Sequence, residues 1–168
     1  DAALEHVKHW RVCLDIGSNI GQWTRPLAQK FRSVICFEPN PNFRECFVMN
    51  IREDNVILWP YGLSDRSHNA KQDFNSTMLR EGDGPIECKT LDSFQLRNVD
   101  FIKIDVDGFE IPLLKGATET LANNDAVINI ELKYDKRKNI ALECVSILKQ
   151  NGYKFKMRTK SDEIWIKS

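Results

Sequence analysis

Residues Leu14–Gly21 read LDIGSNIG and are the most informative stretch of this 168-residue chain. They overlap the end of the apolar run Arg11–Ile16, which predicts a buried strand, and lead into Ile20–Phe31, whose apolar spacing predicts a helix. A glycine-bearing turn between a strand and a helix lies at the carboxyl end of a sheet, where α/β proteins bind ligands. The stretch therefore predicts the first βα unit of an open sheet, with a ligand at its turn.

Strand-like and helix-like segments continue to alternate through the rest of the chain. The predicted strands are Arg11–Ile16, Ser33–Glu38, Asn55–Trp59, Asp100–Val106, Ala126–Leu132, Tyr153–Met157 and Glu163–Lys167. The predicted helices are Ile20–Phe31, Asn42–Ile51, Glu110–Leu121 with a break near Gly116, and Asn139–Gln150. This alternation predicts a mainly parallel sheet with helices on both faces. The short turn Lys160–Asp162 suits an antiparallel hairpin, so we expect one antiparallel strand near the end of the chain.

Length and composition limit the function further. A chain of 168 residues fits one domain, and we expect a single domain over residues 1–168. Lys+Arg and Asp+Glu both total 24, so the formal net charge is zero and binding of nucleic acid through a general positive field is not expected. The sequence carries no membrane-length apolar run and no signal-peptide pattern, and its five cysteines form no C-x-x-C pair. We therefore expect a cytoplasmic protein without a membrane span, and the sequence leaves its oligomeric state open.

The segment Ser64–Cys88 breaks the alternation. It is polar, rich in Gly, Asn, Asp and Ser, and only weakly periodic. Connections of this length inside a compact domain commonly serve function. We predict a substrate-side loop with one short strand at Ile86–Lys89.

The first two strand ends predict the kind of ligand. Gly17 and Gly21 give a G-x-x-x-G turn, Asp15 closes the first strand, and Glu38 closes the second, where a carboxylate can accept hydrogen bonds from ribose hydroxyls. A dinucleotide enzyme normally has G-x-G-x-x-G, whose amides cradle a pyrophosphate. The middle glycine is missing, and Asp15 would repel that group. A sulfonium cofactor with a free amino group suits this acidic turn better.

The chain resembles the FkbM-type methyltransferases over almost its whole length. The matching motifs are Cys13–Gly21, Phe37–Pro41, Gly62–Asp65, Thr90–Phe94, Asp100–Glu110, Leu114–Ala117 and Ile130–Leu132. Their order and spacing both match. One departure is Asp107, where the family more often has Glu, which keeps the charge but shortens the reach.

The resemblance implies a Rossmann-like class I methyltransferase fold with seven strands, the last antiparallel. It also implies S-adenosylmethionine as cofactor and O-methylation as the reaction. By motif position, Asp15, Gly17 and Gly21 would line the methionine part, Glu38 would bind the ribose, and Gly62 and Leu63 would edge the adenine. The full set of implied cofactor-binding residues is Asp15, Gly17, Asn19, Gly21, Glu38, Pro39, Gly62, Leu63 and Asp105.

Polar residues at two strand ends are the candidates for catalysis. Strand alternation places Lys103 and Asp105 on one face, with Glu131 on the neighbouring strand, so the three could form one polar cluster. Methyl transfer to a hydroxyl needs a general base or a metal. Asp105 and Glu131 are the leading candidates, with Asp107 and Lys103 in support and His68 as a weaker base. These carboxylates, with Glu110, could also hold a divalent ion. Alternatively, Lys103–Glu131 is a structural ion pair and Asp107 caps the following helix.

The substrate class comes from the resemblance alone. It implies a hydroxyl of a saccharide or a related polyhydroxylated metabolite, and the basic run Lys133–Lys138 could help to hold a nucleotide- or lipid-linked sugar. Trp59 and Tyr61 are near enough in sequence to the cofactor motifs to stack on adenine. Two other functions stay open: an NAD-dependent oxidoreductase, and a non-catalytic methyltransferase-like module in a glycan-modifying complex.

Overall fold

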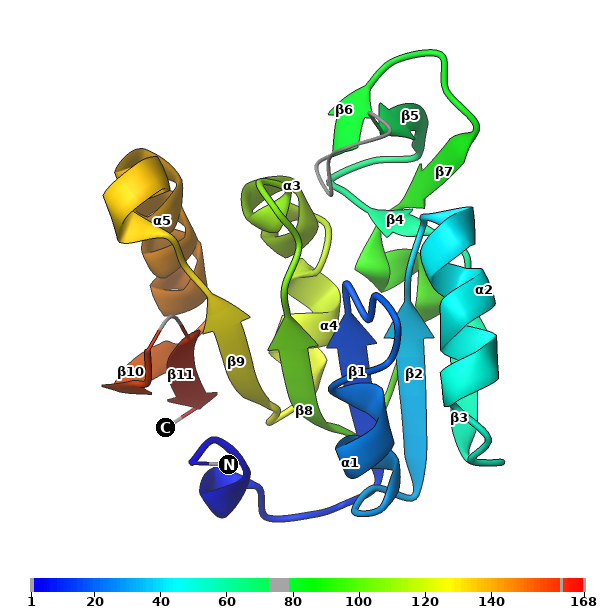
Figure 1. Cartoon of the computed structure of the whole chain (residues 1–168). Helices are drawn as coiled ribbons and strands as arrows, with labels where there is room; N and C mark the ends of the chain where they lie inside the picture. The colour runs from blue at the N-terminus through cyan, green and yellow to red at the C-terminus, as the bar shows by residue number, and fades with distance from the viewer. Residues whose placement is uncertain (1, 73–78, 161, 168) are drawn as a thin grey trace.

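A computed structural model describes residues 2–72, 79–160 and 162–167 (Figure 1). Its centre is a seven-stranded sheet in the order β10-β11-β9-β8-β1-β2-β3. These strands span β1 Val12–Ile16, β2 Ser33–Phe37, β3 Val56–Trp59, β8 Val99–Ile104, β9 Val127–Glu131, β10 Tyr153–Arg158 and β11 Asp162–Lys167. β11 runs antiparallel to both of its neighbours, and the other pairings are parallel. The predicted sheet, with its single antiparallel strand, is confirmed.

Helices cover both faces of this sheet. They are α1 Thr24–Ala28, α2 Pro41–Asn50, α3 Glu110–Lys115, α4 Thr118–Asn123 and α5 Tyr134–Gln150, with short 3-10 turns at η1 Leu4–His6 and η2 Leu91–Phe94. Successive residues of β1 point to opposite faces, as in any strand. Leu14 packs in the core under α3, α4 and α5, and Cys13 packs in the core under α1 and α2. Because the helices cover the two faces of the sheet, they leave uncovered the edge at which the parallel strands end.

Two predicted helices have different bounds in the structure. The helix expected over Ile20–Phe31 is reduced to α1, because the chain before it turns through positive φ at Asn19 and Gly21. The helix expected from Asn139 begins at Tyr134 instead, with a kink at Arg137 (φ −140°, ψ 47°). The break predicted near Gly116 is present, since α3 ends at Lys115 and α4 begins at Thr118.

The prediction of a loop over Ser64–Cys88 is wrong for most of the described part of that segment. It contributes three strands, and with β4 they form a four-stranded sheet in the order β4-β7-β5-β6. These strands are β4 Gly62–Leu63, β5 His68–Gln72, β6 Leu79–Glu81 and β7 Ile86–Lys89. Only β7 was expected. The core of this small sheet has only three buried residues, Ala70, Ile86 and Cys88, which are too few to give a clear alternation of apolar and polar residues in the sequence. Residues 73–78 lie outside the described part of the chain.

The small sheet stands beyond the carboxyl end of β2 (Figure 1). Its base packs closely on the α3–α4 junction, where a Cβ on Gly116 would lie 2.0 Å from the carbonyl oxygen of Ser64. This contact holds the small sheet over the edge where the parallel strands end. Within the described residues, no helix is both long enough and apolar enough to cross a membrane.

Candidate functional site

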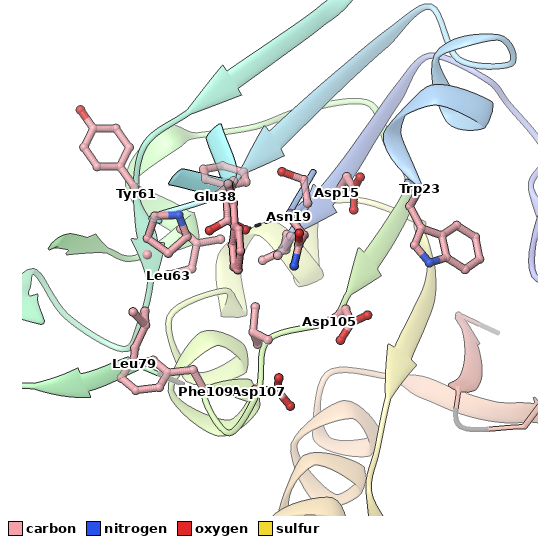
Figure 2. A pocket seen from close by; sticks show the side chains of 18 of the residues that line it. Asp15, Asn19, Trp23, Glu38, Tyr61, Leu63, Leu79, Asp105, Asp107 and Phe109 are labelled. Carbon is pink, nitrogen blue, oxygen red and sulfur yellow. Dashed lines mark hydrogen bonds between the residues drawn. The ribbon is translucent and has the colours of Figure 1, made fainter. Parts of the chain in front are cut away.

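A pocket opens at the carboxyl ends of β1, β2 and β8 and is closed on one side by the small sheet (Figure 2). Its wall contains all but one of the residues that the sequence assigns to the cofactor. These are Asp15, Gly17, Asn19, Glu38, Pro39, Gly62, Leu63 and Asp105. Asp107 also lines the pocket, whereas Gly21, Lys103 and Glu131 do not.

The turn after β1 forms the floor of the pocket. Gly17 has φ +80°, and its N–H and that of Ser18 donate to the carbonyl oxygen of Phe37 at 3.0 and 3.2 Å. A Cβ on Gly17 would lie 2.0 Å from the carbonyl oxygen of Asp105, so only glycine fits there. Gly21 (φ +90°) instead allows close packing, because its Cα faces Ile51 just after α2. The turn is thus fixed to both neighbouring strands.

The carboxylate of Glu38 is held in one orientation at the end of β2. Its Oε2 accepts from the backbone N–H of Asn19 at 2.9 Å, and its Oε1 accepts from that of Asn40 at 2.8 Å. Burial raises the pKa of Glu38, and these two hydrogen bonds oppose the rise. Each carboxylate oxygen retains a lone pair that can accept a further hydrogen bond.

Asp15 is the most deeply buried carboxylate of the pocket, with 1% of its surface exposed. Its Oδ2 accepts a hydrogen bond from Thr24 Oγ1 at 2.6 Å. Burial raises the pKa of Asp15 to about 6, against the lowering effects of Thr24 and Lys103. A buried carboxylate that is ionised at neutral pH provides a strong site for a cationic group.

This raised pKa predicts that Asp15→Asn stabilises the protein at neutral pH. The folded pKa of about 6 exceeds the ordinary value of 3.8, so ionisation of Asp15 destabilises the folded state by an amount that grows as pH rises from about 4 to about 6 and is constant above that. The neutral amide avoids that cost, worth at most about 3 kcal/mol above pH 7. Urea unfolding should show the variant more stable than the wild type at pH 7.5, with little difference at pH 4. A variant less stable at both pH values would contradict this prediction.

Lys103, Asp105 and Glu131 form the predicted cluster, with different pairs from those expected. Lys103 is 1% exposed, and its Nζ lies 3.3 Å from Asp162 Oδ2 and 3.9 Å from Asp105 Oδ2. Partial removal from water raises the pKa of Asp105 to about 6; the charge of Lys103 opposes this rise, and the nearby carboxylate of Glu131 adds to it. The alternative Lys103–Glu131 ion pair is therefore wrong, because Asp162 on β11 takes the place of Glu131.

A second charged group lies at the rim of the pocket. Lys133 Nζ contacts Asp107 Oδ1 at 2.5 Å and Glu131 Oε2 at 3.1 Å, and Arg137 Nη1 lies 3.7 Å from Asp107 Oδ1. Asp107 therefore pairs with the basic run after β9. The alternative role of helix cap is wrong, because the N-cap residue of α3 is Phe109.

The expected carboxylate site for a divalent ion is not formed. Glu110 turns inward to accept from the N–H of Gly108 at 3.1 Å, while Asp107 and Glu131 contact Lys133. Across the described ranges, no group of three or more His, Cys, Asp or Glu side chains is placed to hold a metal ion.

The sequence did not predict some of the residues that line the pocket, and two residues that it did predict near the site, Trp59 and His68, lie elsewhere. The lining residues that sequence reasoning did not assign to the site include Ser18, Trp23, Phe43, Gln72, Leu79 and Phe109. Ser18 Oγ is buried and has no hydrogen-bond partner among the residues that the structure describes, which marks a place for a polar ligand atom. Tyr61 lines the pocket as expected, but Trp59 stacks on Phe94 at a centroid distance of 4.4 Å instead. His68 lies on β5, outside the pocket wall.

Residues 15–155 match the family described as Methyltransferase FkbM domain. The chain belongs to this FkbM methyltransferase family. Hexuronic acid methyltransferase AglP from Haloferax volcanii is 30% identical to it over 138 residues, which cover 74% of this chain and 57% of the relative. The chain thus spans little more than half the length of that relative.

Solved structures share the fold of this FkbM domain. The FkbM methyltransferase from Methylobacillus flagellatus KT has a TM-score of 0.70 and 17% identity, over 94% of this chain and 44% of its own. An rRNA methylase from Streptococcus thermophilus has a TM-score of 0.63 and 14% identity, over 98% and 89% of the two chains. A Streptococcus mutans protein in complex with SAH has a TM-score of 0.59 and 12% identity, over 92% and 85%. The fold is that of the class I methyltransferases.

Proposed function

We propose that this FkbM domain binds S-adenosylmethionine and methylates an oxygen atom of a saccharide. The charge of the pocket is the observation that carries the cofactor assignment. Among the described residues, Asp15, Glu38, Asp105 and Asp107 line the pocket, and no Lys, Arg or His does. Such a wall favours a ligand with a sulfonium and an ammonium group and disfavours a pyrophosphate. It therefore argues against the alternative of an NAD-dependent oxidoreductase.

Separate groups of lining residues fit the amino-acid end, the ribose and the adenine of this cofactor. Asp15 and the unpartnered Ser18 Oγ would hold the amino-acid end, with the ionised Asp15 facing the ammonium group. Glu38 would accept from the ribose hydroxyls with the lone pairs left by its two backbone contacts. Tyr61 and Leu63 would contact the adenine on the side of Glu38 away from Asp15 (Figure 2). Asn19, Pro39 and Gly62 would complete this wall, and Gly17 would keep the turn in place.

The bound cofactor would supply an electrophilic methyl group to an acceptor oxygen. Asp105 would accept the proton of the acceptor hydroxyl, because its side chain is 43% exposed and lines the pocket. The negative charge of the neighbouring Glu131 raises the pKa of Asp105 and would make it a stronger base. Lys103 lies behind Asp105 and outside the wall, so its role would be to position that carboxylate and balance its charge. Asp107, held by Lys133, would border the acceptor.

The acceptor class rests on the relative and on the openness of the site. The H. volcanii relative is named for a hexuronic acid, a sugar with both hydroxyl and carboxyl oxygens. The Asp105 side of the pocket is partly exposed, which suits the end of a larger glycan. A methyl-transfer screen with labelled S-adenosylmethionine over neutral and acidic glycans, free or linked to nucleotide or lipid, tests this class. Cofactor binding with no transfer to any acceptor would favour the non-catalytic module instead.

Calorimetric titration tests the cofactor assignment directly. We expect S-adenosylmethionine and SAH to bind and NAD not to bind. NAD binding with no binding of SAH would overturn the proposed function.

Glu38→Gln should weaken S-adenosylmethionine binding about 10- to 100-fold. The amide keeps the shape of the side chain but turns one oxygen into an N–H donor, which then faces the N–H of Asn19 or Asn40. Glu45→Gln is the matched control, because Glu45 is exposed on α2. Dissociation constants measured by calorimetry at pH 7.5 should be unchanged in the control. Equal affinity in both variants would remove Glu38 from the binding site.

A further inference from the structure

Two residues of the small sheet form a wall of the pocket that the family motifs do not supply. Gln72 on β5 and Leu79 on β6 are cross-strand partners, and both line the pocket. Leu79 packs toward Gly62, where a Cβ would lie 3.0 Å from Leu79 Cδ1. In Figure 2, Leu79 lies on the side of Tyr61 and Leu63, away from Asp15. The wall therefore faces the part of the pocket assigned to adenine.

Asn40 fixes the orientation of the Gln72 amide. As the N-cap of α2, Asn40 accepts at Oδ1 from the N–H groups of Asn42 (2.9 Å) and Phe43 (3.3 Å). Its Nδ2 must then point the other way, and it donates to Gln72 Oε1 at 2.8 Å. Rotating either amide by half a turn would bring two donors or two acceptors together. Gln72 therefore turns Oε1 to Asn40 and keeps Nε2 as a donor.

The Nε2 group of Gln72 is left as a donor for a hydrogen-bond acceptor on a ligand. Among the described residues, Asn40 is the hydrogen-bond partner of the Gln72 side chain, and it occupies the oxygen end. Gln72 is intermediate in exposure, and an N–H group that a bound ligand removes from water costs free energy unless it donates a hydrogen bond to that ligand. The surroundings, Phe43, Tyr61 and Leu79, are apolar or aromatic and suit a flat heterocycle.

We propose that Gln72 is a specificity residue for the cofactor base, donating from Nε2 to a ring nitrogen of adenine. This rests on the proposed function. The ring nitrogens N1, N3 and N7 are acceptors, whereas the 6-amino group is a donor and would be rejected by Nε2.

The first test removes the amide. Gln72→Leu should weaken SAH binding about three- to tenfold in calorimetry, the usual effect of one lost hydrogen bond. Asn69→Leu is the matched control, because Asn69 is an exposed amide on the opposite face of β5. We expect its affinity to equal that of the wild type. Equal affinities for the wild type and Gln72→Leu would overturn the proposal.

The second test identifies the atom. Three analogues of SAH, in each of which N1, N3 or N7 is replaced by C–H, are compared with SAH itself. The wild type should bind one of them about three- to tenfold more weakly than SAH through loss of the accepting nitrogen, and Gln72→Leu should lose that difference. In Asn40→Asp, one carboxylate oxygen still caps α2, and the other needs a donor where Asn40 Nδ2 stood. The Gln72 amide should therefore rotate to turn Nε2 toward the new carboxylate, and the difference between SAH and the analogue should disappear.

The outcomes separate the two proposals. A wild type that binds no SAH overturns the proposed function. A wild type that binds SAH, with the same ratio of analogue affinities in Gln72→Leu as in the wild type, overturns the role of Gln72 and leaves the proposed function in place.

Discussion

Gly17→Ala should lower the free energy of unfolding by about 3–5 kcal/mol. The added Cβ would lie 2.0 Å from the carbonyl oxygen and 2.9 Å from the carbonyl carbon of Asp105. Both belong to backbone that continues directly from β8, so neither can move without shifting the strand end. The φ of +80° adds strain for any side chain. Urea unfolding measures the stability, and calorimetry should show loss of SAH binding in the folded fraction.

Gly152→Ala separates the steric clash from the backbone strain. Gly152 has φ +82°, nearly that of Gly17, but its Cβ would meet no heavy atom of the described residues within 4 Å. This variant should lose only about 1–2 kcal/mol, the cost of the left-handed conformation. If both alanine variants lost the same amount, the close approach of Asp105 to Gly17 would carry no weight in the stability of the site.

Asp105→Asn should lower kcat by about 10²- to 10⁴-fold, the usual contribution of a general base. The amide keeps the size of the side chain but cannot accept the proton of an acceptor hydroxyl. Binding of S-adenosylmethionine should change much less than kcat. The measurement is steady-state methyl transfer to whichever glycan the wild type methylates in the screen. Asp54→Asn is the control, since Asp54 is exposed just before β3.

The pH profile gives a second measure of the same role. The pKa of Asp105 is raised to about 6, and a base acts only when ionised. The wild-type rate should therefore rise as pH increases through about 6 and then level off. Asp105→Asn should lose this acid limb. An unchanged limb in the variant would assign the titration to another group.

The main sheet and most of the pocket could be predicted because their signals are local. The turn at Gly17, the carboxylate of Glu38 and the run ending in Asp105 each lie at the end of an apolar strand, and parallel strands bring their carboxyl ends together. The wall from the small sheet could not be predicted in this way. Gln72 reaches the pocket only because its strand pairs with β6 and β7.

Ion pairs were the least predictable part of the site. Strand alternation correctly placed Lys103 and Asp105 on one face. It could not reveal that Asp162, 59 residues further on, would take the position expected for Glu131. Likewise, only the turn of the chain after β9 brings Lys133 onto Asp107 and Glu131. Such contacts depend on how long side chains extend from neighbouring strands, which spacing does not encode.

The position of β11 sets the order in which a growing chain can complete this site. β10 is made before β11, yet β11 lies between β10 and β9 in the sheet. On the ribosome, β10 therefore has no strand to pair with until β11 has followed it out. Asp162, the residue that contacts buried Lys103, also begins β11. A nascent chain that stops before this strand leaves the lysine without that carboxylate, so completion of the sheet and neutralisation of the charge behind Asp105 occur in one step, when β11 emerges.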